Sequence, residues 1–477
     1  MMKRYIFLAA ILFPFIGFSQ NEKWDLRRCV EYALEHNISV RQSDVQARIS
    51  ALQLKFAKAQ QIPSLTFSTN PGYTFGRSVN QSTYSYVNTT AFQQGYNLQT
   101  GVTLFNWFSI VNNIKSSQKS AEADALDIQR AKNDVALNVA NAYLQLLNAV
   151  EQVNISKTIL SLDSAQLSLI RKQVDAGAKS DFDLATQEKQ LATDSSNFFT
   201  NAATMNLNKI QLMALLNLNL EESFEVDVPD VARIPLVPIG ELEPTYLYQV
   251  AKQNQFQQRV DSLRIAAELY AIKSRKGSMF PTISFGGNIG TNYSNQLTAV
   301  TGFSAPTLPA IGTVSVAGTN YNVYPLQPVQ NPIYSSVGYF KQLKDNRGEG
   351  LGLTLNFNIF NGRTARTNYE REKLNLKNLQ LTQESNNQKL QQNIYTAYNN
   401  ALSGLNTYNS NLKAANAADY AYTLAKKRYD IGASATADYL QALNNLYQAR
   451  ISQSISHYSY IFSLKVLEFY RDNNIKL

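Results

Sequence analysis

The feature that most constrains this fold is the exclusion of helix-breaking residues from two long stretches. Residues 108–216 contain no proline and one glycine, Gly177, and residues 363–470 contain no proline and two glycines, Gly404 and Gly432. Glycine costs a helix interior about 1 kcal/mol and proline about 3 kcal/mol, so both are kept out of long helices. The two stretches are therefore predicted to form long helical hairpins, one turning at Gly177 and the other at Gly432.

Apolar residues within both stretches recur at alternating steps of four and three. The first stretch has Val139, Tyr143, Leu146, Val150 and Val153, and the second has Ile394, Tyr398, Ala401, Leu405, Tyr408, Leu412 and Ala415. This seam is typical of helices that pack against helices. A helix over residues 108–173 would be about 100 Å long at the usual rise per residue. Such a length indicates that the hairpins span a distance rather than enclose a compact core.

The chain is also an internal duplication, visible as residue matches at two constant offsets. At an offset of 255 residues, Phe105 and Asn106 match Phe360 and Asn361, Asp175 and Gly177 match Asp430 and Gly432, and Asp183 matches Asp438. At an offset of 218 residues, the segment 63–67 matches the segment 281–285. The two offsets differ by 37 residues, which predicts a longer loop between Phe285 and Leu351 in the second copy.

The first residues have the pattern of a secretory signal peptide. Lys3 and Arg4 precede an apolar run over residues 6–18, and Gly17 and Ser19 supply the small residues of a cleavage site. A retained membrane anchor is the alternative, but the run is short for a bilayer span and contains a proline. We therefore predict a leader over residues 1–19. The rest of the chain divides into a first repeat (residues 20–228), a proline-rich linker in an equatorial region (229–242), a second repeat (243–470) and a C-terminal tail (471–477).

Segments of strand character precede the helical stretches. In residues 351–359, leucine and other apolar residues alternate with glycine, threonine and asparagine. The same period of two occurs in residues 64–68, 98–104 and 282–290. One apolar face and one small polar face, on segments of about ten residues, are what a transmembrane barrel wall requires. Soluble hairpins packed on a core show the same alternation and are the alternative. Residues 70–97 and 291–350 are rich in Tyr, Asn, Ser, Thr and Gly and are predicted to be outer loops.

Four strands are too few to close a barrel, because the smallest closed barrels need about eight. An open sheet in lipid would leave unpaired backbone groups. The chain is therefore predicted to oligomerise, and three copies would supply twelve strands. The expected fold class is a mixed α and β membrane protein, with long helical hairpins that form a coiled-coil tunnel and four transmembrane strands per chain.

The composition excludes most kinds of chemistry. The chain has two histidines, His36 and His457, and one cysteine, Cys29, which leaves no residues for a metal cluster or a disulfide framework. The sequence has no glycine-rich phosphate loop and no nucleophile with an obvious base, so neither a cofactor nor an enzymatic activity is expected. The formal charge of +9 is spread along the chain rather than gathered in a patch, which argues against a nucleic-acid partner.

These features resemble the outer-membrane efflux, or TolC-like, channel family over residues 24–470. The resemblance is carried by Phe360, Asn361 and Gly362, where a strand passes into a long helix, and by the hairpin tip 428–432 with Asp438 beyond it. It implies a homotrimer whose twelve-stranded barrel contacts outer-membrane lipid of a diderm bacterium, above a helical tunnel that crosses the periplasm. It also implies two protein partners: an inner-membrane transporter of the RND or ABC type, and a periplasmic adaptor (membrane fusion) protein that docks on the hairpin tips.

The resemblance further implies that the tips form the periplasmic gate or the adaptor-docking site. The residues concerned are Arg428, Tyr429, Asp430, Gly432 and Asp438 in the second tip, and Asp175, Gly177 and Asp183 in the first. Arg428 and Tyr429 are expected to bond to neighbouring helices or to an adaptor, and Gly432 is expected to adopt a positive φ. Threefold symmetry would turn Asp430 and Asp438 into carboxylate rings that favour cations. An ordinary solvated turn, with Asp438 capping a helix, is the alternative.

Two functions follow from the sequence. The favoured one is a passive exit duct of a tripartite efflux or type I secretion system. The alternative is a soluble periplasmic coiled-coil scaffold without a pore. A scaffold needs no strands that feed long helices, whereas a duct needs strand-to-helix junctions between barrel and tunnel. The sequence places such junctions at Phe105, Asn106, Phe360, Asn361 and Gly362.

Overall fold

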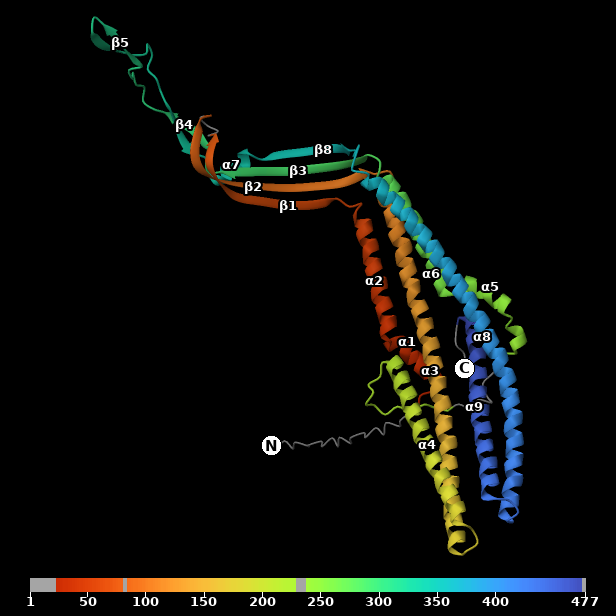
Figure 1. The fold of residues 1–477 in the computed structure, drawn as a ribbon. Coiled ribbons are helices and arrows are strands. Elements are labelled where there is room, and N and C mark those ends of the chain that lie inside the picture. The colour runs from red at the N-terminus through yellow and green to blue at the C-terminus, as the bar shows by residue number, and fades with distance from the viewer. Residues whose placement is uncertain (1–22, 80–83, 229–236, 474–477) are drawn as a thin grey trace, which may run out of the picture. The chain divides into compact units, whose positions relative to one another are not determined.

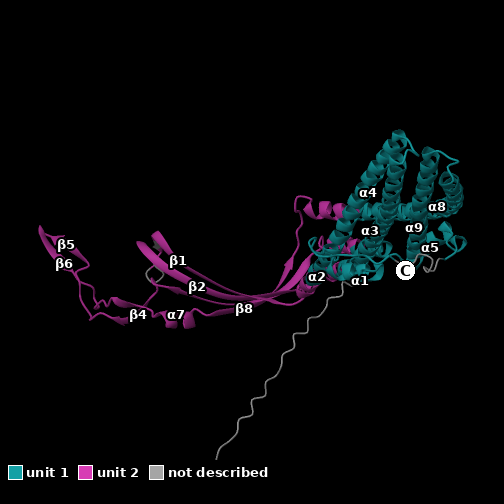
Figure 2. Ribbon diagram, turned by 90° about the horizontal axis from the view of Figure 1, so that it is seen from below, with its two compact units in different colours: residues 1–52, 118–267, 375–477 teal, residues 53–117, 268–374 magenta. Residues whose placement is uncertain are grey.

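The computed structural model describes residues 23–79, 84–228 and 237–473. The predicted leader, the linker prolines Pro229 and Pro235 and the last four residues lie outside the described residues. The chain divides into two compact units, coloured separately in Figure 2. Unit 1 comprises residues 1–52, 118–267 and 375–477, and unit 2 comprises residues 53–117 and 268–374.

The two predicted helical hairpins are present (Figure 1). The first consists of α3 (Ser109–Asp175) and α4 (Asp181–Leu216), and the second of α8 (Thr364–Asp430) and α9 (Thr436–Asp472). Helices α3 and α8 each contain 67 residues, and the offset of 255 relates them at both ends. The duplication in the sequence is therefore a duplication of structure.

Two shorter helices precede the strands in each copy, where the sequence analysis predicted one. They are α1 (Leu26–His36) and α2 (Ile38–Ala59) in the first copy, and α5 (Pro244–Asn254) and α6 (Phe256–Gly277) in the second. The offset of 218 relates both pairs residue by residue. A short 3-10 helix, η2 (Ile239–Glu241), precedes α5. The break between the helices of each pair falls on one polar residue, Asn37 or Gln255, whose backbone is extended.

Apolar side chains fill three separate cores in the described part of unit 1, and one of them lies near the hairpin tips around Tyr429, Tyr439 and Tyr447. The first lies among α1, α3 and α4, where the seam residues Val139, Tyr143 and Leu146 are almost fully buried together with Cys29. The second lies among α5, α8 and α9 and buries Ile394 and other residues of the second seam. The seams that the sequence predicted are therefore the packing surfaces of the hairpins.

Unit 2 contains a four-stranded antiparallel sheet in the order β1-β2-β3-β8. Its strands are β1 (Ser64–Val79), β2 (Tyr86–Phe105), β3 (Thr282–Ser294) and β8 (Gly348–Asn356), which run side by side in Figure 1. The register pairs Phe67 with Leu98, Val102 with Phe285, and Phe285 with Leu353. Directly paired residues share a face of the sheet, so the apolar residues of all four strands lie together.

The opposite face of the sheet carries small and polar residues. Thr66 pairs with Gln99, Gly101 with Gly286, and Ser284 with Thr354. No second sheet layer covers the apolar face within the described residues, and Leu65, Leu351 and Leu353 are each at least 69% exposed. The strand alternation predicted from the sequence is confirmed, and the face that it defines is bare in a single chain.

The structure corrects the predicted outer loops. Residues 70–97 were expected to be irregular, but β1 continues to Val79 and β2 begins at Tyr86, so most of this segment is strand. Residues 291–350 contain the end of β3, the start of β8, and four short strands and a helix between them. These elements are β4 (Thr298–Phe303), β5 (Gly312–Val316), β6 (Thr319–Val323), β7 (Pro332–Ser336) and α7 (Tyr339–Asp345). The four short strands form two separate two-stranded antiparallel sheets, in which β4 pairs with β7 and β5 pairs with β6.

None of the helices in the described ranges combines the length and the apolar character that a membrane-spanning helix needs.

Candidate functional site

Both hairpins turn at a glycine with a positive φ. The φ angle is 73° at Gly177 and 74° at Gly432. In the second tip, the N–H of Gly432 donates to the carbonyl of Tyr429 and the N–H of Ala433 donates to the carbonyl of Arg428. This pair of bonds is the Schellman motif, and the first tip has the same pair at Gly177. The positive φ expected at Gly432 is confirmed, because its backbone must close the last turn of the helix.

The two returning helices begin differently. In the first hairpin, Ser180 caps α4: its hydroxyl accepts from the N–H of Asp183, and the carboxylate of Asp183 accepts from the N–H of Ser180. This reciprocal capping box satisfies two backbone donors. At the same position of the second hairpin, Ala435 supplies no side-chain cap for α9. Asp438 lies in the first turn of α9 and accepts a bond from the hydroxyl of Ser434 at 3.2 Å instead.

Side chains near the tips join the first hairpin to the second. The amide of Gln166 in α3 donates to the phenol oxygen of Tyr429 at 2.9 Å. The ammonium of Lys179 donates to the hydroxyl of Thr436 at 2.8 Å and lies 4.7 Å from the centre of the Tyr429 ring. The Tyr429 ring also stacks on Tyr439, with 4.8 Å between the ring centres. We call Gln166, Lys179, Tyr429, Thr436 and Tyr439 the tip cluster.

The tip cluster shows which partner Tyr429 has within one chain. Tyr429 was expected to bond to a neighbouring helix or to an adaptor, and it accepts a bond from α3 of its own chain while its side chain is buried. Arg428, Asp430 and Asp175 are exposed. Asp430 forms an ion pair with Lys426 at 2.9 Å, whereas Asp438 has no ion-pair partner among the described residues. The exposed charges of the tip are thus not equivalent.

The strand-to-helix junctions also have the same form in the two copies. Asn106 and Asn361 are each followed by two residues with positive φ, between 52° and 64°. In the first copy these residues are Trp107 and Phe108, and in the second they are Gly362 and Arg363. The backbone N–H three residues after each asparagine donates to the asparagine carbonyl. The Phe-Asn motif therefore marks a tight turn that starts α3 and α8, with Phe105 and Phe360 exposed before it.

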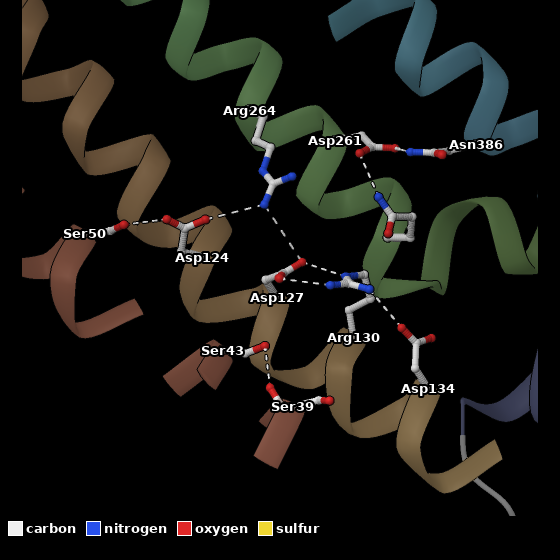
Figure 3. Close-up of polar contacts among 11 residues, drawn as sticks. Ser39, Ser43, Ser50, Asp124, Asp127, Arg130, Asp134, Asp261, Arg264 and Asn386 are labelled. Atoms are coloured by element: carbon white, nitrogen blue, oxygen red, sulfur yellow. Dashed lines mark hydrogen bonds and ion pairs between the residues drawn. The ribbon is translucent and has the colours of Figure 1, made fainter. Parts of the chain in front are cut away.

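A charged network that the sequence analysis did not identify crosses unit 1 (Figure 3). In α3, Arg130 binds both carboxylate oxygens of Asp127, at 2.6 Å and 3.1 Å, and also binds Asp134 at 2.8 Å. Arg264 of α6 lies 3.5 Å from Asp124 of α3. Ser50 of α2 donates to the other oxygen of Asp124. The network joins three helices, and the spacing of three and four residues among its acidic and basic residues in α3 is the signal that would have revealed it.

The pKa values of two carboxyl groups in the network are shifted in opposite directions. The hydrogen bond from Arg130, reinforced by its charge, holds the pKa of Asp127 below its usual range. Burial raises the pKa of Asp134 against the opposing effect of Arg130. The described part of the chain contains no group of three or more His, Cys, Asp or Glu residues arranged to hold a metal ion. The bonds of the network between α2, α3 and α6 are suited to hold these helices together.

Comparison with known proteins places these elements in one family. Residues 29–218 and 247–468 match the family described as outer membrane efflux protein. These two segments cover both helical hairpins, and the second includes β3 to β8. Among curated proteins, the chain is 20% identical over 267 residues to toxin and drug export protein A of Aggregatibacter actinomycetemcomitans. That alignment spans 56% of this chain and 56% of the relative, or about half the length of each.

Solved structures of outer-membrane channels share the fold over nearly the whole chain. The channel OprN has a TM-score of 0.72 at 17% identity, covering 94% of this chain and 89% of its own. VceC of Vibrio cholerae has a TM-score of 0.72 at 14% identity, covering 94% and 95%. CmeC of Campylobacter jejuni has a TM-score of 0.69 at 17% identity, covering 94% and 85%. Given the extent of the family match and this shared fold, the chain belongs to the outer membrane efflux protein family.

Proposed function

We propose that this protein is the outer-membrane exit duct of an efflux or secretion system, through which a cargo passes passively. The observation that carries the proposal is the four-stranded sheet, which has one predominantly apolar face and, among the described residues, two unpaired edges. An exposed apolar face of this size marks contact with another protein or with a membrane. The small polar residues on the opposite face suit a water-filled interior.

The edges of the sheet support assembly into a closed barrel. Strands β1 and β8 each have one neighbour in the sheet, so a row of backbone N–H and C=O groups is unpaired along each outer edge. In lipid these groups need partners. Pairing of β8 with β1 of the next copy satisfies both edges, and three copies close twelve strands into a barrel. The six helical hairpins of such a trimer would form the wall of a tunnel on the periplasmic side.

The tips are the proposed contact points for partners. A periplasmic adaptor would dock on the exposed charges of the hairpin tips, and an inner-membrane transporter of the RND or ABC type would supply the energy. The name of the curated relative mentions toxin and drug export. We accordingly propose small toxic compounds as the first cargo class to test, by comparing the growth of deletion and complemented strains on a panel of such compounds.

Location and assembly test the duct directly. The protein is expected in the outer-membrane fraction, and native mass spectrometry of the detergent-purified protein should give three times the mass of the processed chain. Three copies should also produce channel conductance in planar bilayers. Recovery as a periplasmic monomer that gives no conductance would instead support the alternative, a coiled-coil scaffold without a pore.

A further inference from the structure

Two aspartates lie buried against each other inside the first hairpin. Asp163 of α3 is 1% exposed and Asp194 of α4 is 7% exposed. Seven residues along each helix from the bond between Asn201 and Ser156, Asp163 and Asp194 lie opposite each other in the hairpin, and the interaction between their carboxyl groups contributes to a raised pKa of Asp163. Two ionised carboxylates that are buried against each other repel, so the contact is favourable only when one of them carries a proton.

In the described part of the chain, the polar partners of the pair are amides and not paired cations. On α4, Gln187 directs its amide toward the backbone carbonyl of Asp163 at 3.4 Å, and Gln190 donates to Asp194 at 2.8 Å. The nearest basic residues along the chain, Lys157 and Lys189, are exposed. Two other basic residues are engaged elsewhere: Arg171 binds Glu188, and Arg450 of α9 binds Asp419. Among the described residues, no lysine or arginine forms an ion pair with either aspartate.

Tyrosines of the second hairpin form the rest of the environment. Tyr439 and Tyr447 of α9 face the pair from that side, and the ring of Tyr422 in α8 lies 5.9 Å from the ring of Tyr439. The hydroxyl of Tyr447 is buried and lacks a hydrogen-bond partner. Burial raises the pKa values of Tyr439 and Tyr447, so both phenols stay neutral. Burial, followed by the contact with Asp194, raises the pKa of Asp163 to about 8.

A polar cavity gives the pair a route to water. The cavity has a volume of about 420 Å³ and lies among α3, α4 and α9. Asp194 lines it together with Ser156, Asn201, Asn444 and Tyr447. Water in such a cavity would find several hydrogen-bond partners. A proton can therefore reach Asp194 without opening of the hairpin.

The second hairpin shows that the fold does not require the pair. At the offset of 255, Asp163 corresponds to Ala418 and Asp194 corresponds to Ala449. Gln187, whose amide faces Asp163, corresponds to Ala442. Three buried polar residues of the first hairpin are thus replaced by alanine at the matching positions of the second. This asymmetry indicates a role specific to the first hairpin.

We propose that Asp163 and Asp194 form a proton-binding site that controls how firmly the first hairpin packs against the second. With one shared proton, the pair holds α3 and α4 together beneath Tyr439 and Tyr447. When the proton is lost, two buried like charges repel, and the contact between the hairpins loosens. The consequence for opening of the duct rests on the proposed function, whereas the proton binding itself does not.

The sign of the pH effect follows from the direction of the pKa change. The folded chain binds the proton more tightly than the unfolded chain, whose carboxyl has an ordinary pKa of 3.8. The stability that the proton supplies is fully present below that value and is lost as the pH rises toward 8. Within this window, the equilibrium constant for folding falls by up to about tenfold per pH unit for one proton.

Infrared spectroscopy tests the site in the purified full-length protein. We expect the carbonyl stretch of a protonated carboxylic acid to disappear with a midpoint near pH 8. Asp163→Asn should remove this carbonyl band, because the asparagine has no carboxyl group to protonate while its amide can donate to Asp194. Glu268→Gln is the matched control, because burial also raises the pKa of Glu268, and it should leave the band in place. A wild-type spectrum with no protonated acid above pH 6 would overturn the proposal, even if no variant folds.

Thermal unfolding gives a second test that is independent of channel activity. The melting temperature of the wild type should fall between pH 5 and pH 8 more steeply than that of Asp163→Asn. Addition of calcium at pH 9 should not raise the melting temperature of the wild type. A calcium-dependent rise that Asp163→Asn lacks would make the pair a metal site and would refute proton control. If both tests succeed and no conductance is found, the proton site stands and the duct function fails.

Discussion

At the scale of single residues, the duplication allows each position of one hairpin to be compared with the matching position of the other. Ser180 caps the returning helix of the first hairpin, and Ala435 occupies the matching position of the second without a side-chain cap. The backbone around both residues is extended, as a helix cap requires. The difference between the two tips is therefore one of side-chain chemistry and not of backbone shape.

The capping difference predicts opposite effects for two substitutions. Ser180→Ala should destabilise the start of α4 by about 1 kcal/mol, because two backbone donors lose their partners. Ala435→Ser should stabilise the start of α9 by a similar amount, since Asp438 already lies where a capping box needs it. Hydrogen exchange of the amides in each first turn measures both effects. Unchanged protection in both variants would show that the tips are held by other contacts.

Gly404 is the one glycine that interrupts the middle of a long helix. A side chain at this position would lie 3.1 Å from the backbone of Tyr460 in α9. The glycine therefore allows α8 and α9 to approach closely.

Gly404→Ala tests this close approach. Propensity alone predicts a gain of about 1 kcal/mol, whereas we expect a net loss, because the two helices must move apart. Thermal unfolding of the purified protein gives the sign. The exposed turn residue Gly240, which has free space around it, provides a control in Gly240→Ala. A stabilised Gly404→Ala variant would refute the packing explanation.

At the scale of elements, the sequence predicted the hairpins to within one or two residues and misplaced the strand ends. The exclusion of Gly and Pro is a local signal, so the helix bounds could be read directly. Strand β1 continues through Pro71, Gly72 and Gly76 because its neighbour β2 pairs with every residue, and such pairing outweighs local propensity. The tip cluster depends on contacts between residues about 250 positions apart in the chain, and the buried aspartate pair joins residues about 30 positions apart. A local sequence pattern does not reveal contacts of this kind.

The bare face of the sheet gives a prediction for one strand. Leu353 lies on the apolar face of β8, and its neighbour Thr354 lies on the polar face. Leu353→Arg should cost about 2–4 kcal/mol if the residue lies near the middle of the bilayer, and the amount of trimer in the outer membrane should fall. Thr354→Arg places the same charge on the other face and should assemble normally. Equal trimer yields from the two variants would show that the lipid-facing side has been assigned incorrectly.

At the scale of the whole molecule, the proposed trimer would place three copies of each tip charge around one axis. Asp430 is partly neutralised by Lys426, while Asp438 is exposed and has no cationic partner among the described residues. A ring of Asp438 carboxylates would therefore contribute more to the field at the tunnel mouth than a ring of Asp430 carboxylates would.

Ion selectivity distinguishes the two rings. In planar bilayers, Asp438→Asn should reduce the preference for cations more than Asp430→Asn, and neither variant should lose the trimer. Tyr429→Phe removes the bond from Gln166, which is worth about 1 kcal/mol of contact between the two hairpins. On the hypothesis that this contact keeps the tunnel mouth closed, the variant should raise conductance without a change in selectivity. If selectivity is unchanged in both aspartate variants, the constriction lies elsewhere in the duct.

The equal length of α3 and α8 limits how a protein of this kind can evolve. One heptad inserted into both helices of a single hairpin would shift its tip by about 10 Å relative to the other. The bonds from Gln166 to Tyr429 and from Lys179 to Thr436 would then be broken. The hairpins of such a protein can therefore become longer or shorter during evolution only when both copies of the duplication gain or lose the same segment. If the hairpins cross the periplasm as proposed, the distance between the two bacterial membranes would act on the lengths of all four helices together.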